Sequence, residues 1–157
     1  MVDFGVILKR QIAPLFKMVD KSISSIEECD LDRIIGSKYQ LWKMIYHPLF
    51  WIHFHLSRKE DFIVPQFHEE GMNSLDIISK RTIGKIELVE YSNIVFKRTI
   101  KYIEEIDMDQ NTREITDIDK ILGQIRHFSF HIGMLYTSIF NENGNMLDTI
   151  GPEYNNL

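Results

Sequence analysis

Two histidines, His127 and His131, are spaced four residues apart in a segment with helical periodicity. On a helix this spacing turns by only about 40°, so both imidazoles leave the same face one turn apart. Two imidazole nitrogens presented in this way can hold one metal ion without distorting the backbone. Six histidines in 157 residues also make such a spacing easy to find by accident. The pair alone leaves both a metal site and a structural role open.

The neighbours of this pair place it at the margin of a buried helix face. An apolar stripe lies beside the pair and is expected to point into the core, formed by Ile121, Ile125, Phe128, Ile132, Leu135 and Ile139. The histidine side of the helix is shared by Lys120, Gln124, Met134 and Ser138. A metal site at this margin would be shielded from bulk solvent but accessible to a small molecule. The same position is also compatible with a purely structural histidine.

The other four histidines fall between positions 47 and 68. His47 lies in the middle of a second predicted helix, and its neighbours on the same side are Lys43, Met44, Trp51 and Phe54. Pro48 removes a backbone hydrogen bond beside it, which is costly unless it positions something, although a harmless kink is the simpler interpretation. We expect His53 on the surface, His55 behind the site or in the core, and His68 in a loop that could reach the site.

Hydrophobic periodicity indicates four helices of similar length. They span about residues 3–25, 38–56, 85–106 and 116–140. Thr116 followed by Asp119 is typical of a helix N-cap, and Pro14 predicts a kink in the first helix. The expected apolar positions of the third helix are Ile86, Val89, Ile94, Phe96 and Ile103. Strand alternatives are weak, because the β-branched residues recur at helical spacing.

The segment between the second and third helices, residues 57–83, is too long for a plain turn and indicates a functional loop. It contains Pro65, His68, Glu69, Glu70 and Gly71. We expect a short helical turn near residues 74–79, and the pair Asn143–Gly144 indicates a turn after the last helix. This organisation predicts an all-α, four-helix bundle with a long crossover between helices 2 and 3, forming a single domain over residues 1–157.

Composition limits the classes of protein to which the chain can belong. A hydrophobic content of 44% and a charged content of 26% are ordinary for a globular domain. The net charge of −5 disfavours nucleic acid as a partner. One cysteine, Cys29, allows no internal disulfide and fits a reducing compartment. No apolar run approaches the ~18–20 residues of a membrane span, and the order of Asp3 and Lys9-Arg10 is wrong for a secretory signal. We therefore expect a cytoplasmic protein.

Two short motifs resemble those of the DinB-like (YfiT-like) metalloenzyme family. Residues 46–51, YHPLFW, resemble its second-helix motif, and residues 126–133, RHFSFHIG, resemble its fourth-helix motif. The helix order, the long crossover and the overall length also agree, so the resemblance covers most of the chain. It implies a zinc, nickel or similar ion held by His47, His127 and His131. Pro48 departs from the small or hydroxyl residue expected after the helix-2 histidine, which puts the orientation of that histidine in question.

Three neutral imidazoles leave open positions on an ion, as in a catalytic site. Such a position can activate water, or hold a thiol as the nucleophilic thiolate. Water attack usually needs a nearby carboxylate base, and neither metal helix carries one on its histidine face, although Glu69 or Glu70 could reach in from the loop.

The resembled family includes transferases and isomerases that use low-molecular-weight thiols. We therefore expect a metal-dependent thiol S-transferase acting on a small molecule. A metal-dependent hydrolase is the second hypothesis, and a non-catalytic helical binding or dimerisation module is the third. The aromatic residues of the second helix would then be core or a dimer face, and a homodimer is our expectation for the oligomeric state.

Overall fold

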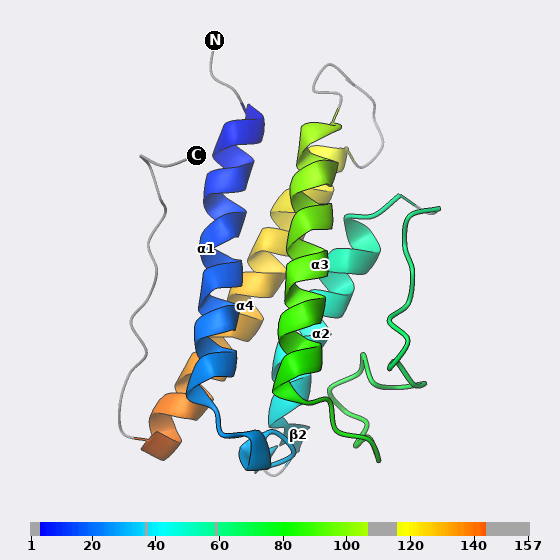
Figure 1. Ribbon diagram of the computed structural model, residues 1–157. Helices are drawn as coiled ribbons and strands as arrows, with labels where there is room; N and C mark the ends of the chain where they lie inside the picture. The colour runs from blue at the N-terminus through cyan, green and yellow to red at the C-terminus, as the bar shows by residue number, and fades with distance from the viewer. Residues whose placement is uncertain (1–3, 37, 59, 107–115, 144–157) are drawn as a thin grey trace.

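The computed structural model shows four helices packed side by side (Figure 1), and it describes residues 4–36, 38–58, 60–106 and 116–143. The helices are α1 (Phe4–Ser25), α2 (Leu41–His55), α3 (Lys85–Glu104) and α4 (Asp117–Asn143). Helices α1 and α3 pack against each other, as do α2 and α4, and each helix of one pair also contacts the other pair. The predicted all-α, four-helix architecture is confirmed. None of the described helices is long and apolar enough to cross a membrane.

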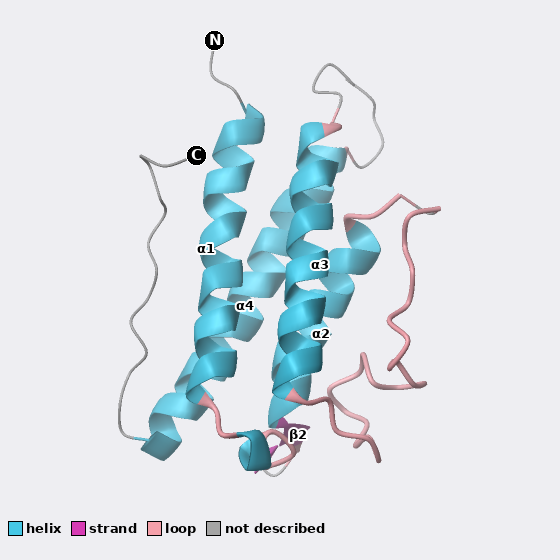
Figure 2. Ribbon diagram, viewed as in Figure 1, coloured by secondary structure: helices cyan, strands magenta, loops and turns pink. Residues whose placement is uncertain are grey.

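A small antiparallel hairpin precedes α2 and was not predicted (Figure 2). Its strands are β1 (Ile34–Ile35) and β2 (Tyr39–Gln40), and a short 3-10 helix, η1 (Glu28–Asp30), lies just before them. Gly36 adopts a φ of 57° at the turn, a conformation open to glycine at little cost. The second helix was expected to start near residue 38, but it begins three residues later, at Leu41. The apolar periodicity continues upstream of the helix, where the chain forms the hairpin instead.

The N-terminus of α4 is capped as predicted. The Asp119 amide donates to the Thr116 hydroxyl at 3.2 Å, and the Thr116 amide donates to the Asp119 carboxylate at 3.0 Å. The helix continues three residues beyond its predicted end at Phe140. The predicted turn at Asn143–Gly144 extends outside the described residues. Pro14 lies inside α1, as expected.

Each helix contributes one face to a shared apolar core. The stripe predicted on α4 is buried throughout, except that Ile125 is half-buried. Of the apolar positions expected on α3, Ile103 is buried and Phe96 is half-buried, whereas the other three, Ile86, Val89 and Ile94, are exposed, at 75%, 39% and 48%. The buried residues of α3 are Leu88, Tyr91, Ser92, Val95, Thr99 and Ile103. A 3.6-residue period fits several offset stripes on such a helix, and packing against α1 and α2 selects one of them.

The crossover between α2 and α3 runs alongside the bundle as turns and extended chain, without a helix among its described residues. The helical turn expected near residues 74–79 is wrong, since only residues 75 and 76 form a turn there. The carbonyls of Ser74 and Ile77 accept hydrogen bonds from the side chain of Lys43 instead. Gln40 fixes Ser79 in the same way. Its side-chain NH2 group donates to the Ser79 carbonyl, and its side-chain oxygen accepts from the Ser79 amide.

Candidate metal centre

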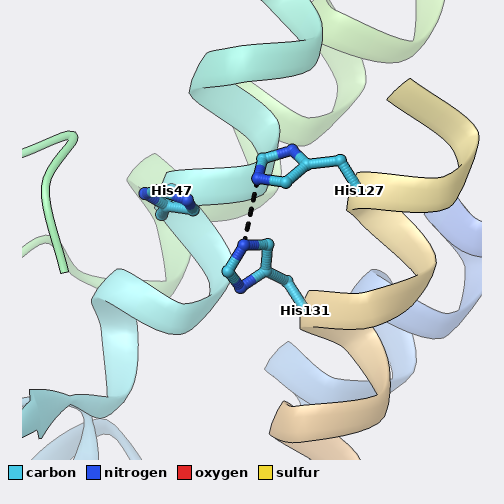
Figure 3. A group of neighbouring side chains, drawn as sticks. All are labelled: His47, His127 and His131. Carbon is cyan, nitrogen blue, oxygen red and sulfur yellow. Dashed lines mark hydrogen bonds between the residues drawn. The ribbon is translucent and has the colours of Figure 1, made fainter. Parts of the chain in front are cut away.

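Three imidazoles meet where α2 packs against α4 (Figure 3). His47 projects from α2 toward His127 and His131, which leave α4 one turn apart. The ring centroid of His47 lies 4.5 Å from that of His131 and 5.4 Å from that of His127. One nitrogen from each of the three rings can be chosen so that all lie within 4.8 Å of one another. The three histidines singled out from the sequence are thus close enough to hold a metal ion.

The α4 pair is already near the separation that two ligands of one ion require. The Nε2 atoms of His127 and His131 are 3.0 Å apart and share a hydrogen bond. Tetrahedral zinc with Zn–N bonds of 2.0–2.1 Å separates two ligand nitrogens by about 3.3 Å. A bound ion would replace the shared proton with bonds to both lone pairs. Side-chain rotations that bring all three nitrogens to this separation would complete the coordination.

The tautomer of His47 is fixed by a backbone carbonyl from the crossover. Its Nδ1 lies 2.7 Å from the carbonyl oxygen of Asn73. A carbonyl oxygen can only accept, so Nδ1 carries the proton and Nε2 keeps its lone pair. Metal-binding histidines usually donate their other nitrogen in this way, which fixes both the tautomer and the ring orientation. The helix α2 runs unbroken through Pro48, so the orientation of His47 is compatible with a ligand role.

The surroundings keep all three rings uncharged, as a metal ligand must be. Burial lowers the pKa of His131 to about 4, and the neighbouring His47 and His127 act in the same direction. Burial also lowers the pKa of His47, partly offset by the hydrogen bond to Asn73. The pKa of His127 is lowered by burial and then by the charge of His55. At neutral pH little free energy is spent on removing protons before an ion can bind.

A fully buried lysine holds the loop that carries the Asn73 carbonyl. Lys43 lies one turn before His47 on α2 and has no exposed surface. Its ammonium donates to the carbonyls of Gly71 at 3.1 Å, Ser74 at 3.0 Å, and Ile77. These three carbonyls flank Asn73, so Lys43 and His47 both form hydrogen bonds to the same stretch of backbone. Sequence reasoning placed Lys43 beside His47 but did not find this role, because a backbone acceptor leaves no trace in residue types.

No carboxylate joins the three imidazoles in the part of the chain that the structure describes. Glu69 and Glu70, considered as possible bases from the loop, are exposed and lie outside this cluster. The negative charge of Asp76 acts to raise the pKa of His47, and nothing in the sequence indicated this acid. Asp76 is itself exposed and forms an ion pair of 2.6 Å with Lys38. The donor set is therefore three neutral nitrogens.

The remaining histidines lie outside the cluster. His53 is buried at 2% exposure, so its expected surface position is wrong: this side of α2 is covered by α3 and the crossover. His55 is exposed and stacks on Trp51, so it is not in the core, although its charge reaches His127. His68 comes from the loop, as expected. Its Nδ1 shares a hydrogen bond of 2.7 Å with the Tyr46 hydroxyl, and it is not part of the group of three imidazoles.

An open groove runs along α4 on the side of Phe130, and none of the three histidines lines it. It has a volume of about 620 Å³ and is lined by residues of α4, the hairpin and the start of α2. Phe130, whose ring centroid is 5.3 Å from that of His131, forms part of this wall together with Met44 and Met134. Every residue lining the groove is uncharged. The groove could therefore accept an apolar part of a small molecule.

Comparisons with protein-family models, with curated proteins and with solved structures gave no match to this chain.

Proposed function

We propose that this protein is a divalent-metal-dependent enzyme of the thiol S-transferase type, related to the DinB-like metalloenzymes. His47, His127 and His131 would hold the ion, zinc or nickel by the preference of imidazole ligands. The observation that carries the proposal is the convergence of three ligand nitrogens within 4.8 Å. Three protein ligands leave a coordination position open, which distinguishes a catalytic from a structural zinc site.

The donor set supports thiol chemistry in preference to hydrolysis. A bound divalent ion supplies a Lewis acid that keeps a thiol in its thiolate form, the nucleophile of an S-transfer. Three neutral imidazoles would not cancel the charge of the ion, which favours an anionic sulfur. Metal-assisted hydrolysis instead calls for a carboxylate base. Asp76, the acid whose charge acts on His47, is exposed and paired with Lys38.

The surroundings of the cluster suggest how two substrates would be received. In S-transfer the sulfur bonds to a carbon of the second substrate, the leaving group departs with its electron pair, and the thiol proton passes to solvent. The uncharged groove walled by Phe130 and Met134 would bind the apolar part of that second substrate, since the Phe130 ring also contacts His131. Burial of His131 excludes water from one side of the centre.

Metal uptake is the first test of this function. Tag-free protein, stripped with a chelator, is titrated with zinc, nickel and cobalt(II), and we expect one equivalent to bind. His127→Gln should lose stoichiometric binding, whereas His68→Gln, outside the cluster, should retain it. If wild-type protein takes up no metal, the enzyme proposal is wrong and a non-catalytic helical module becomes the better explanation.

Thiol binding is the second test. Adding cysteine or glutathione to the cobalt(II) protein should produce the near-ultraviolet charge-transfer absorption of a cobalt-thiolate bond. Serine, which replaces the thiol of cysteine with a hydroxyl, is the matched control and should leave the spectrum unchanged. A protein that binds cobalt but shows no response to thiols would contradict the transferase assignment and favour hydrolysis, with Asp76→Asn as the next variant to assay.

A further inference from the structure

A second cavity lies away from the three imidazoles, between α3 and the crossover. Its volume is about 530 Å³, within the range of small-molecule sites. From α2, His53 lines this cavity. His53 lies six residues after His47, which places the two side chains about 120° apart around the helix axis. Apolar walls are provided by Ile63, Val64, Pro65, Phe67 and Ile94. Three of these, Ile63, Val64 and Ile94, are exposed at 65%, 45% and 48%.

A buried histidine without a full set of partners forms one end of this cavity. His53 is 2% exposed, and its Nδ1 lies 3.1 Å from the hydroxyl oxygen of Tyr91. The buried hydroxyl of Tyr91 has no other hydrogen-bond partner among the described residues, so we assign it as the donor to Nδ1, which places the proton of His53 on Nε2. Among the described residues this Nε2 is buried and has no hydrogen-bond partner. A buried N–H donor without an acceptor is costly, and a ligand oxygen would relieve that cost.

Arg98 brings an uncompensated positive charge to the same end. It is half-buried, lines the cavity and donates a hydrogen bond to the carbonyl of Asp61. No carboxylate within the described part of the chain forms an ion pair with it, whereas Arg81 is paired with Glu87 at 2.7 Å. The charge of Arg98 acts on His53, whose pKa burial lowers first, to about 4. At neutral pH this end therefore offers a guanidinium and a neutral N–H donor.

The opposite end of the cavity has the opposite charge. Glu87 and Glu90 line it from the first turns of α3. Glu87 is neutralised by Arg81, but Glu90 is exposed and forms no ion pair among the described residues. Eight residues of helix separate Glu90 from Arg98, a rise of about 12 Å, with Ile94 midway between them. Such a polarised cavity would accept one negative charge at the Arg98 end and repel a second at the Glu90 end.

We propose that this cavity binds a small monocarboxylate with an apolar body. The carboxylate would take charge-assisted hydrogen bonds from Arg98 and, once a rotation of the buried imidazole exposes it, from Nε2 of His53. Its apolar body would lie against Ile94 and the 63–67 segment. A guanidinium suits a carboxylate because its parallel N–H groups match the two oxygens. The site is separate from the metal centre and does not depend on the function proposed for it.

Octanoate is the probe for this proposal, measured by isothermal titration calorimetry. Wild-type protein should bind one equivalent, with the same affinity in chelator-treated and metal-loaded samples. Octan-1-ol, of the same length but uncharged, should bind at least about tenfold more weakly, the loss expected for a charge-assisted hydrogen bond. Octanedioate should also bind more weakly than octanoate, and Glu90→Gln should recover part of that difference.

Variants on one helix provide matched controls. Arg98→Met should weaken octanoate binding at least about tenfold and leave octan-1-ol unchanged. Lys97→Met removes the same charge from the adjacent exposed position of α3, outside the cavity, and should bind octanoate as wild type does. Absence of saturable octanoate binding overturns the proposal, and so does equal binding of octan-1-ol or an undiminished affinity in Arg98→Met. The Glu90→Gln and octanedioate measurements remain informative if Arg98→Met does not fold.

Discussion

Two sides of α2 carry histidines with contrasting neighbours, His47 half-buried and His53 buried. On the side that packs against α4, His47 meets two further imidazoles and one backbone carbonyl. On the side that faces α3 and the crossover, His53 meets the hydroxyl of Tyr91 and the charge of Arg98. The first group contains no charged side chain, and the second combines a cation, a donor and apolar walls.

The contrast shows that a shifted pKa does not by itself identify the chemistry of a histidine. Burial lowers the pKa of His131 and of His53 alike, to about 4 in each case. The two histidines differ in the groups that surround their ring nitrogens. Nitrogen lone pairs aimed at a common point suit a cation, whereas an unpaired N–H beside a guanidinium suits an anion. The predictions below separate these two roles, from the largest expected effect to the smallest.

The largest effect is expected for the loss of a metal ligand. His131→Gln should weaken zinc affinity by about a hundredfold or more, since structural zinc sites share about 10–16 kcal/mol among their ligands. Competition with a colorimetric chelator measures this change. His53→Gln, an identical substitution on the opposite side of α2, should leave zinc affinity unaltered. Equal losses in both variants would contradict the division of α2 into two sides.

The next effect concerns the anchor of the crossover. Lys43→Met leaves the carbonyls of Gly71, Ser74 and Ile77 without their donor and should release the segment around Asn73. We expect zinc affinity to fall about tenfold to a hundredfold, as for other partners that orient a ligand. The stability of the fold should fall by about 3 kcal/mol because three partly buried carbonyls lose their hydrogen-bond donor.

Hydrogen exchange of residues 71–77 would show the release directly, and urea denaturation would measure the stability. Lys80→Met is the matched control, because this lysine is exposed and lies in the same crossover. If Lys43→Met binds zinc normally while the loop exchanges faster, then the Asn73 carbonyl does not orient His47.

The smallest effect is a change in the pH dependence of stability on the other side of α2. The pKa of His53 is about 4 in the folded protein and about 6.5 in an unfolded chain. Between these values the unfolded chain binds a proton that the folded protein excludes, so stability is complete above pH 6.5 and declines as the pH falls toward 4. The slope should be about 1.4 kcal/mol per pH unit for this histidine.

Urea denaturation of chelator-treated protein from pH 7 to 4.5 measures this slope. His53→Gln should reduce the wild-type slope by about that amount, because glutamine does not titrate and can still accept from Tyr91. His55→Gln, two residues further along α2 but exposed, should reduce it less. An unchanged slope in His53→Gln would mean that His53 is not kept neutral by its burial.

Local sequence determined the parts of this protein that depend on neighbours along one helix. The periodicity of α4, its cap at Thr116 and the shared face of His127 and His131 were all predicted, since each follows from helix geometry alone. The choice of His47 as the third ligand came from the resemblance of its motif to a family, because no periodicity relates α2 to α4 across 80 residues.

Only the tertiary structure decided the features that depend on which surfaces meet. His53 and Lys43 belong to polar residue types, yet the folding of the crossover over α2 buries both, and their hydrogen bonds compensate for that burial. The buried face of α3 was decided for a related reason, as its sequence permits several faces and its neighbours select one. The Asn73 carbonyl belongs to the backbone, which every residue type shares, so its role emerges only when the chain brings it to His47.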